Sequence, residues 1–232
     1  DLAQAICNFA DVHGSALNMA DMAAHRVDWC GTVSQSFDDI SLHEIPPNGQ
    51  GIAALMALGI LSHTSVRKMD ADDPAAFHLQ IEAMKLALAD AETYVADSDY
   101  MTDVSKEALL DADYLKARAA LIDPTRAQDF KAGAPKHGGT VYLTVGDASG
   151  MMVSFIQSNY AGFGSGVVIP GTGIAMQNRG AGFSLDPASQ NCVGPNKRPF
   201  HTIIPGFLMG ADGPLMSFGV MGGPMQAQGH VQ

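Results

Sequence analysis

Thr140 is the residue whose surroundings point most directly to chemistry. It follows Gly138-Gly139 and opens the run Thr-Val-Tyr-Leu-Thr-Val. If the Gly139–Thr140 peptide bond were cut, Thr140 would carry a free α-amino group beside its own hydroxyl, a base and a nucleophile in one residue. An α-amino group titrates near ~8 and can accept a proton at neutral pH. A Gly-Gly-Thr string alone is more typical of a turn into a strand, so the hypothesis depends on the rest of the chain.

The composition changes at this junction. Of 24 acidic residues only three follow Thr140, and three basic residues balance them, so the net charge of −11 belongs to residues 1–139. Glycine shifts the other way, with 8 before Thr140 and 17 after it. We therefore expect two parts, a helix-rich part over residues 1–139 and a strand-rich part over residues 140–232.

The overall composition narrows the class of protein. With 232 residues and 47% apolar content, the chain can bury a substantial core, which is typical of a soluble globular protein. Its acidity argues against nucleic acid and anionic membrane surfaces as partners, and no apolar run approaches the ~18 residues of a membrane span. The three cysteines lack metal-like spacing. We expect neither a metal nor a cofactor, and the composition assigns no compartment.

Helix signals dominate the first part. Asp73-Pro74 is an N-cap followed by Pro at the first helical position, which predicts a helix from there to about residue 95. Its apolar positions suggest that Phe77, Ile81, Met84 and Leu88 form the packed face. Residues 52–61 and 111–122 are predicted to form two further helices.

The second part changes to strand patterns. Residues 140–145 and 151–157 flank Asp147-Ala148-Ser149-Gly150, which predicts a β-hairpin. Further strands are expected over residues 173–177, 203–209 and 215–221, separated by loops rich in glycine and proline.

Short strings spread along nearly the whole chain carry a family resemblance. They are residues 46–51 (Pro-Pro-Asn-Gly-Gln-Gly), the helix 78–90, residues 140–147, 163–166 and 194–199, Asn178 with Phe183-Ser184, and Gly222-Gly223. In this order they resemble the γ-glutamyltranspeptidase family of N-terminal-nucleophile hydrolases. The resemblance implies an α+β fold, the four-layer αββα sandwich. It also implies a precursor that cuts itself before a Thr into a large and a small subunit that stay together. Because family members extend further in both directions, we expect this chain to be truncated at both ends.

The resemblance assigns roles to particular residues. Thr140 matches the nucleophile, and Gly139 precedes the bond that is cut. Gly222 and Gly223 match the oxyanion hole, whose backbone N–H groups stabilise charge on the attacked carbonyl oxygen. Ser158 falls where the family has a Thr whose hydroxyl assists the nucleophile.

The substrate-pocket positions depart from the family pattern. Asn178 and Thr202 fall among pocket positions, Tyr160 replaces another pocket Asn, and His201 replaces the first of two pocket serines. The Asp that grips the substrate's α-ammonium is Gly182 here, and a nearby Gln is Arg179. This exchange favours an acyl group that ends in a carboxylate and lacks an α-amine, such as a glutaryl or oxamic-type amide. Alternatively, Arg179 pairs with a carboxylate of the protein.

Three hypotheses for function stay open at this point. The first is a self-processing amidohydrolase that acts on a small acyl amide and releases the acyl group to water or an amine. The second is a true γ-glutamyltransferase or glutathione hydrolase, which is the family's commonest activity. The third is a binding protein on the same fold that has lost self-processing.

Overall fold

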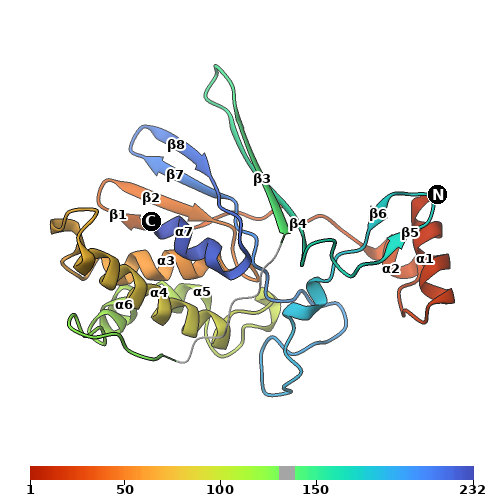
Figure 1. The fold of residues 1–232 in the computed structure, drawn as a ribbon, viewed down its shortest axis with the longest axis horizontal. Helices are drawn as coiled ribbons and strands as arrows, with labels where there is room; N and C mark the ends of the chain where they lie inside the picture. The colour runs from red at the N-terminus through yellow and green to blue at the C-terminus, as the bar shows by residue number, and fades with distance from the viewer. Residues whose placement is uncertain (131–138) are drawn as a thin grey trace.

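The computed structural model describes residues 1–130 and 139–232 (Figure 1). Its helices are α1 (Leu2–Val12), α2 (Met19–Ala24), α3 (Gly51–Leu61), α4 (Pro74–Tyr94), α5 (Lys106–Leu109), α6 (Ala112–Ala119) and α7 (Gln226–Val231). Short 3₁₀ turns are η1 (Val66–Lys68), η2 (Ser98–Tyr100), η3 (Arg179–Gly182) and η4 (Gly223–Met225). The strands are β1 (Val33–Phe37), β2 (Ile40–Glu44), β3 (Gly139–Gly146), β4 (Met152–Tyr160), β5 (Val168–Ile169), β6 (Ile174–Ala175), β7 (Gly206–Gly210) and β8 (Gly213–Phe218).

A four-stranded antiparallel sheet joins the two halves of the chain. Its order is β1-β2-β7-β8, and Ser41 of β2 lies opposite Met209 of β7. Strands from before and after Thr140 therefore share one hydrogen-bonded ladder. β7 and β8 overlap two of the segments predicted to be strands, 203–209 and 215–221, apart from Gly210 of β7 and the first two residues of β8. β1 and β2 were not predicted, because only helices were expected in the first part.

The core lies between this sheet and the helices on one of its faces (Figure 1). α3 is buried on nearly all sides, and Ile52, Leu55, Met56 and Ile60 are completely inaccessible to solvent. A helix that is apolar all round is expected at the centre of a fold rather than at its surface. The prediction of a helix over residues 52–61 is therefore confirmed, and this helix supports both the sheet and α4.

α4 begins as predicted but buries a different face. Asp73 caps it by accepting the Ala75 N–H at 2.8 Å, and Pro74 occupies its first turn. The predicted face is wrong in two places, since Phe77 and Ile81 are 41% and 47% exposed. The buried face instead includes Leu86 together with two carboxylates, Glu82 and Asp90, whose polarity hides it from a search for apolar spacing.

Asp90 ties α4 to α6. Its carboxylate accepts the Tyr114 hydroxyl at 2.8 Å and an Arg118 guanidinium N–H at 2.8 Å. Burial raises the pKa of Asp90, while the contacts with Tyr114 and Arg118 oppose that rise. The buried charge is tolerated because it has both a cation and a hydroxyl donor.

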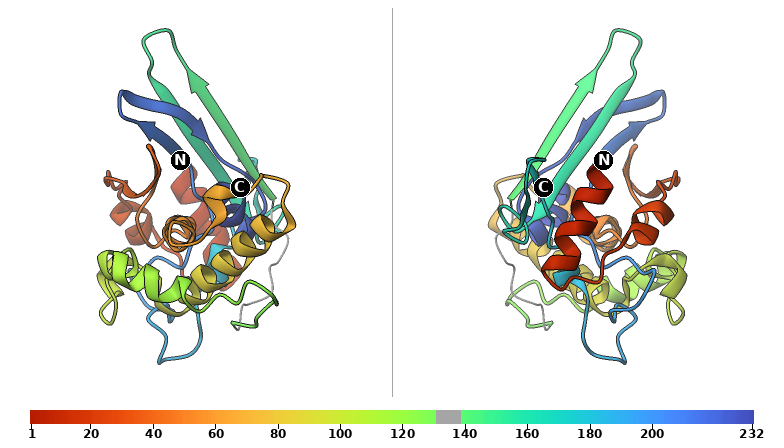
Figure 2. Two further views of the ribbon diagram at one scale, coloured as in Figure 1. Left: turned by 90° about the vertical axis from the view of Figure 1, so that its left-hand side faces the viewer. Right: turned by 90° about the vertical axis from the view of Figure 1, so that its right-hand side faces the viewer.

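The predicted hairpin is present as β3 and β4. Its turn closes as the Gly150 N–H donates to the Asp147 carbonyl at 3.1 Å. The Ser154 hydroxyl donates to the Phe218 carbonyl at 3.2 Å, which places β4 beside β8. Figure 2 shows the hairpin extending past the sheet. The mixture of packed helices with antiparallel strands is the α+β class that was predicted.

None of the helices within residues 1–130 and 139–232 is long and apolar enough to cross a membrane.

The observed face of α4 leads to a stability prediction. Leu86→Ala should lower the free energy of unfolding by about 2–5 kcal/mol, because it leaves a cavity under α3. Ile81→Ala, five residues away on the exposed side, should change it by less than about 1 kcal/mol. Urea unfolding of the two variants measures the difference. A larger loss for Ile81→Ala would mean that the predicted face was right.

Candidate functional site

Thr140 lies at an irregularity in the β3–β4 ladder. Gly139 pairs with Tyr160 and Val141 pairs with Gln157, so the single residue Thr140 faces two residues of β4. This is the geometry of a β-bulge, which bends a strand and redirects a side chain. The bulge therefore falls at the residue predicted to be the nucleophile.

Ser158 is the hydroxyl next to Thr140. The Thr140 hydroxyl donates to Ser158 Oγ at 3.3 Å, and the Tyr160 N–H donates to the same oxygen at 2.9 Å. Tyr160 has a φ of 76°, an uncommon backbone conformation for a residue with a side chain. The hydroxyl of Ser158, predicted to assist the nucleophile, thus lies beside Thr140, and the Tyr160 N–H holds it in place.

Arg179 is a buried cation in η3. It is only 7% exposed, and its Nη1 donates to Thr202 Oγ1 at 2.7 Å. Its guanidinium carbon lies 5.0 Å from the centre of the Tyr160 ring. In the described parts of the chain no carboxylate lies within ion-pair distance, and Nε is buried without a partner. Burial lowers the pKa of Arg179, because desolvation disfavours the charged form.

Gln50 connects the pocket residues to the predicted oxyanion glycines. Its buried Nε2 donates to the Thr202 carbonyl at 2.6 Å and to the Gly223 carbonyl at 2.9 Å. Gln226 Nε2 also donates to the Gly223 carbonyl, at 3.2 Å. This bridge was not predicted from the sequence, although Gln50 lies in one of the strings that carry the family resemblance.

Gly222 and Gly223 form the turn that enters η4. Their φ values are 140° and 63°, in the region that glycine adopts without strain. Within the part of the chain that the structure describes, neither amide N–H donates a hydrogen bond. Two adjacent N–H groups are thus left available for a ligand oxygen.

The remaining pocket positions have packing roles of their own. Asn178 Oδ1 accepts the Ala161 N–H at 3.1 Å and holds the chain after β4. A Cβ on Gly182 would lie 2.6 Å from the Phe200 carbonyl oxygen, so a side chain there requires a backbone shift. The structure therefore leaves no room for the family's Asp at this position.

His201 lies next to Thr202 and is neutral at pH 7. Its Nδ1 accepts the Ile203 N–H at 3.3 Å, so the proton of the neutral ring belongs on Nε2. Burial, the larger cause, and the positive charge of Arg179 together lower the pKa of His201 to about 4. A neutral imidazole beside a buried guanidinium avoids a second positive charge in the pocket.

A continuous set of contacts links the predicted residues. In order along the contacts, it runs through Thr140, Ser158, Tyr160, Arg179, Thr202, Gln50 and Gly223. An apolar cavity of about 530 Å³ lies elsewhere, between the sheet, α3 and α7, and none of these residues lines it. We place the candidate site at these contacts because they contain the predicted nucleophile, a buried cation and free backbone donors. No three His, Cys, Asp or Glu side chains among the described residues gather as metal ligands.

His201 predicts a pH dependence of stability. A folded pKa of about 4 against 6.5 in the unfolded chain means that the unfolded state binds the proton first as the pH falls. The free energy of unfolding should therefore fall between pH 6.5 and 4, by roughly 3 kcal/mol from this residue. His201→Asn keeps an acceptor near Nδ1 and should flatten the slope in urea titrations. His63→Asn, at an exposed turn, is the control and should leave the slope unchanged. An unaltered slope in His201→Asn would contradict the assignment.

Comparison with known proteins places this chain in a family. The family model described as gamma-glutamyltranspeptidase matches residues 1–232. The chain is 40% identical over 215 residues to an oxamate amidohydrolase proenzyme of Klebsiella pneumoniae, covering 93% of this chain and 40% of that protein. It is 36% identical over 232 residues to a glutathione hydrolase-like proenzyme, YwrD, of Bacillus subtilis, covering 98% of this chain and 43% of that protein.

A solved structure gives the same result for the fold. The chain superimposes on a cephalosporin acylase from Bacillus halodurans with a TM-score of 0.92 and 49% identity, covering 100% of this chain and 42% of that one. The chain thus spans about two fifths of the length of these proteins. The match confirms the α+β, αββα fold class expected from the resemblance. This chain belongs to the gamma-glutamyltranspeptidase family.

Proposed function

We propose that this chain is part of a self-processing amidohydrolase whose nucleophile is Thr140. Its relatives include proteins named as proenzymes, which is in keeping with a precursor that is cut into subunits. The Thr140–Ser158 contact and the free amides of Gly222 and Gly223 support the same reading. Residues 1–139 would then end the large subunit, and residues 140–232 would begin the small one.

In the proposed reaction, the freed α-amino group of Thr140 accepts the proton of its own hydroxyl. Oγ1 then bonds to the amide carbon of the substrate, and the Gly222 and Gly223 N–H groups stabilise the oxyanion. The carbon–nitrogen bond breaks as the leaving amine takes the proton, which leaves an ester on Thr140. Water, or an acceptor amine, then releases the acyl group and regenerates the hydroxyl. The base, the nucleophile and the oxyanion donors of this proposed reaction are all groups of the protein.

The observation that carries the choice of substrate is the unpaired burial of Arg179. A buried cation without an anion is costly, and a carboxylate on the bound acyl group would supply the missing charge. A guanidinium also matches a carboxylate with two parallel hydrogen bonds. We therefore propose an acyl group that ends in a carboxylate.

Gly182 supports the second half of that proposal, the absence of an α-amine on the substrate. The position offers no carboxylate to an ammonium, and the Phe200 carbonyl crowds it. A glutaryl-type or oxamate-type amide fits both conditions, in keeping with the acylase and oxamate amidohydrolase names of two relatives. Glutathione hydrolysis is the second candidate, favoured by the name of the Bacillus subtilis relative.

Self-processing is tested with the complete protein. The wild-type precursor should separate into two chains on a denaturing gel, the smaller with Thr140 at its N-terminus. Thr140→Ala should stay a single chain without amidase activity, because it lacks the attacking oxygen. Thr140→Ser should still be cut, since it keeps a hydroxyl. A wild-type protein that stays intact would favour the binding-protein hypothesis, and cleavage of Thr140→Ala would exclude Thr140 as the nucleophile.

Substrate preference is tested with glutaryl and γ-glutamyl anilides, which differ only in the α-amino group. The processed enzyme should have the higher kcat/KM on the glutaryl compound. Arg179→Gln should lower that value roughly 10- to 100-fold, the loss expected for one charge-assisted hydrogen bond. Arg126→Gln, which removes an exposed arginine, is the matched control.

Either alternative outcome has a clear meaning. Preference for the γ-glutamyl anilide would overturn the pocket assignment and favour the glutathione-hydrolase function. Cleavage of neither anilide by a protein that does process itself would point to a smaller acyl group, and release of ammonia from oxamate would then be measured.

A further inference from the structure

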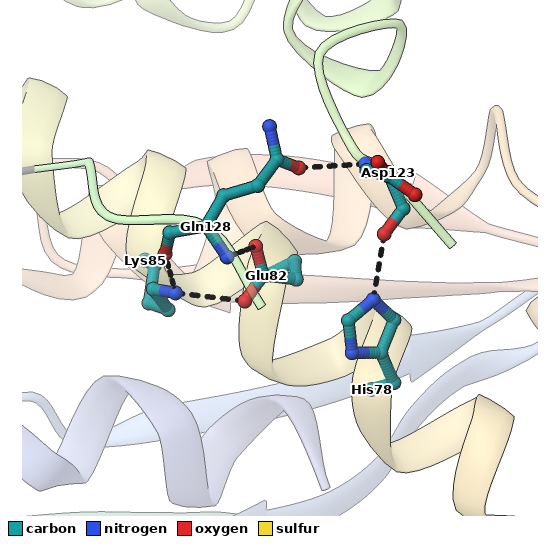
Figure 3. Close-up of polar contacts among 5 residues, drawn as sticks. All are labelled: His78, Glu82, Lys85, Asp123 and Gln128. Atoms are coloured by element: carbon teal, nitrogen blue, oxygen red, sulfur yellow. Dashed lines mark hydrogen bonds and ion pairs between the residues drawn. The ribbon is translucent and has the colours of Figure 1, made fainter. Parts of the chain in front are cut away.

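One face of α4 carries a polar cluster that the proposed reaction does not use. We call it the α4 anchor: His78, Glu82 and Lys85 of α4, with Asp123 and Gln128 of the segment that follows α6 (Figure 3). The three helical positions are spaced by four and three residues, so they lie on one side of the helix. They also fall within one of the strings that carry the family resemblance, for which sequence analysis gave no role.

Glu82 and Lys85 hold both backbone groups of Gln128. Glu82 Oε2 accepts the Gln128 N–H at 3.1 Å, and Glu82 Oε1 accepts Lys85 Nζ at 2.8 Å. Lys85 Nζ also donates to the Gln128 carbonyl. The backbone of Gln128 is therefore fixed in both direction and register, as Figure 3 shows.

His78 and the Gln128 side chain fix the other end of the segment. His78 Nε2 donates to the Asp123 carbonyl at 2.8 Å, and the Asp123 N–H donates to Gln128 Oε1 at 2.6 Å. Lys85 Nζ lies 5.4 Å from the centre of the Phe130 ring, which packs against the core. The anchor thus reaches from Asp123 to Phe130.

The anchor is a costly way to fill this part of the core. The Glu82 side chain is 1% exposed, and burying a carboxylate costs more than burying an apolar side chain of the same size. Such a charge is tolerated because Lys85 and the Gln128 N–H satisfy it. Apolar packing could cover the same area, but it would not fix the register of a backbone segment.

The position of the anchored segment suggests why its register is fixed. Phe130 lies nine positions before Gly139 in the sequence, and Gly139 begins β3, where it pairs with Tyr160 of β4. The chain is therefore held on both sides of the segment that leads to the Gly139–Thr140 bond, by the anchor before it and by the hairpin at the bond itself.

We propose that the α4 anchor positions the precursor for its own cleavage, an inference that rests on Thr140 being the nucleophile. Thr140 Oγ1 bonds to the Gly139 carbonyl carbon, and the Gly139–Thr140 carbon–nitrogen bond breaks as the α-amine takes the hydroxyl proton. Water then cleaves the resulting ester into a Gly139 carboxylate and a free Thr140 hydroxyl. This attack needs the Gly139 carbonyl held against Oγ1, and the anchor fixes the start of the chain segment that leads to this carbonyl. His78, Glu82 and Lys85 are positioning residues in this step and take no part in later turnover.

The test follows cleavage of freshly synthesised complete protein over time on denaturing gels. Glu82→Gln places a side-chain NH₂ group where a carboxylate oxygen accepts from Lys85 Nζ or the Gln128 N–H, so one of these bonds is lost. It should slow cleavage by ~10-fold or more, since small misplacements of reacting atoms have effects of this size. The matched control is Asp90→Asn, which removes another buried carboxylate of α4, but one that contacts α6 rather than the anchored segment. It should be cleaved at the wild-type rate, even if thermal unfolding shows that it is the less stable variant.

A second readout separates positioning from folding. Once cleaved, Glu82→Gln should hydrolyse its anilide substrate at the wild-type kcat per cleaved molecule. If Glu82→Gln does not fold, His78→Leu decides, because it removes one half-buried donor and should also slow cleavage without changing kcat.

The opposing outcomes are distinct. Slowing of both Glu82→Gln and Asp90→Asn in proportion to their lost stability would overturn the proposal, as would a wild-type rate in Glu82→Gln. If that rate is normal while Thr140→Ala stays uncut, the anchor proposal alone fails. Cleavage of Thr140→Ala would instead overturn the proposed nucleophile, and the role of the anchor in this reaction with it.

Discussion

The pairing of β2 with β7 is the constraint on which the rest of the structure depends. It places a strand from before Thr140 and a strand from after it in one ladder, with Leu42 opposite Leu208. α3 follows β2 closely and lies in the core, so both parts of the chain cover the same apolar interior. A cut at the Gly139–Thr140 bond would remove one covalent link and leave the ladder and the core contacts in place. Self-processing on this fold is therefore compatible with an intact site.

The site depends on the same pairing through Gln50. This residue precedes α3, and its side chain holds the carbonyl groups of Thr202 and Gly223, which lie on either side of β7 and β8 in the sequence. One buried amide thereby sets the pocket wall and the oxyanion turn relative to each other. Without Gln50 the Thr202 carbonyl would lose this donor, at a cost of about 1–3 kcal/mol, whereas the Gly223 carbonyl would keep its bond from Gln226.

The sequence predicted the elements whose signals are local. The Asp73-Pro74 start of α4, the apolar α3 and the 147–150 turn each need only a few neighbouring residues to be recognised. β1 and β2 were missed, although Asp38-Asp39 separates two short runs and Asp38 adopts a φ of 56° suited to a tight hairpin. The buried face of α4 was assigned wrongly because it includes two carboxylates. Asp90 is satisfied by Tyr114 and Arg118, and Glu82 in part by the Gln128 N–H, and helical periodicity cannot include these distant residues.

The sequence predicted which residues belong to the candidate site, but not the contacts that join them. The family resemblance named Thr140, Ser158 and Arg179, and the structure links these three through a short set of contacts. The bridge by Gln50 and the crowding at Gly182 depend on segments far apart in the sequence. Neither can be seen from residue types alone, because a buried amide and a glycine have many other uses.

The buried charges of α4 and the buried charge of the candidate site differ in whether they have a partner of opposite charge. Glu82 and Asp90 are each matched by a cation and by a further donor. Arg179 is equally removed from solvent, but the described residues give it a hydroxyl and an aromatic ring in place of an anion. Arg179 thus differs from the two buried carboxylates of α4, which are both paired within the described residues. Under the proposed function, the missing partner arrives with the substrate, and a carboxylate on the acyl group supplies the charge that complements Arg179.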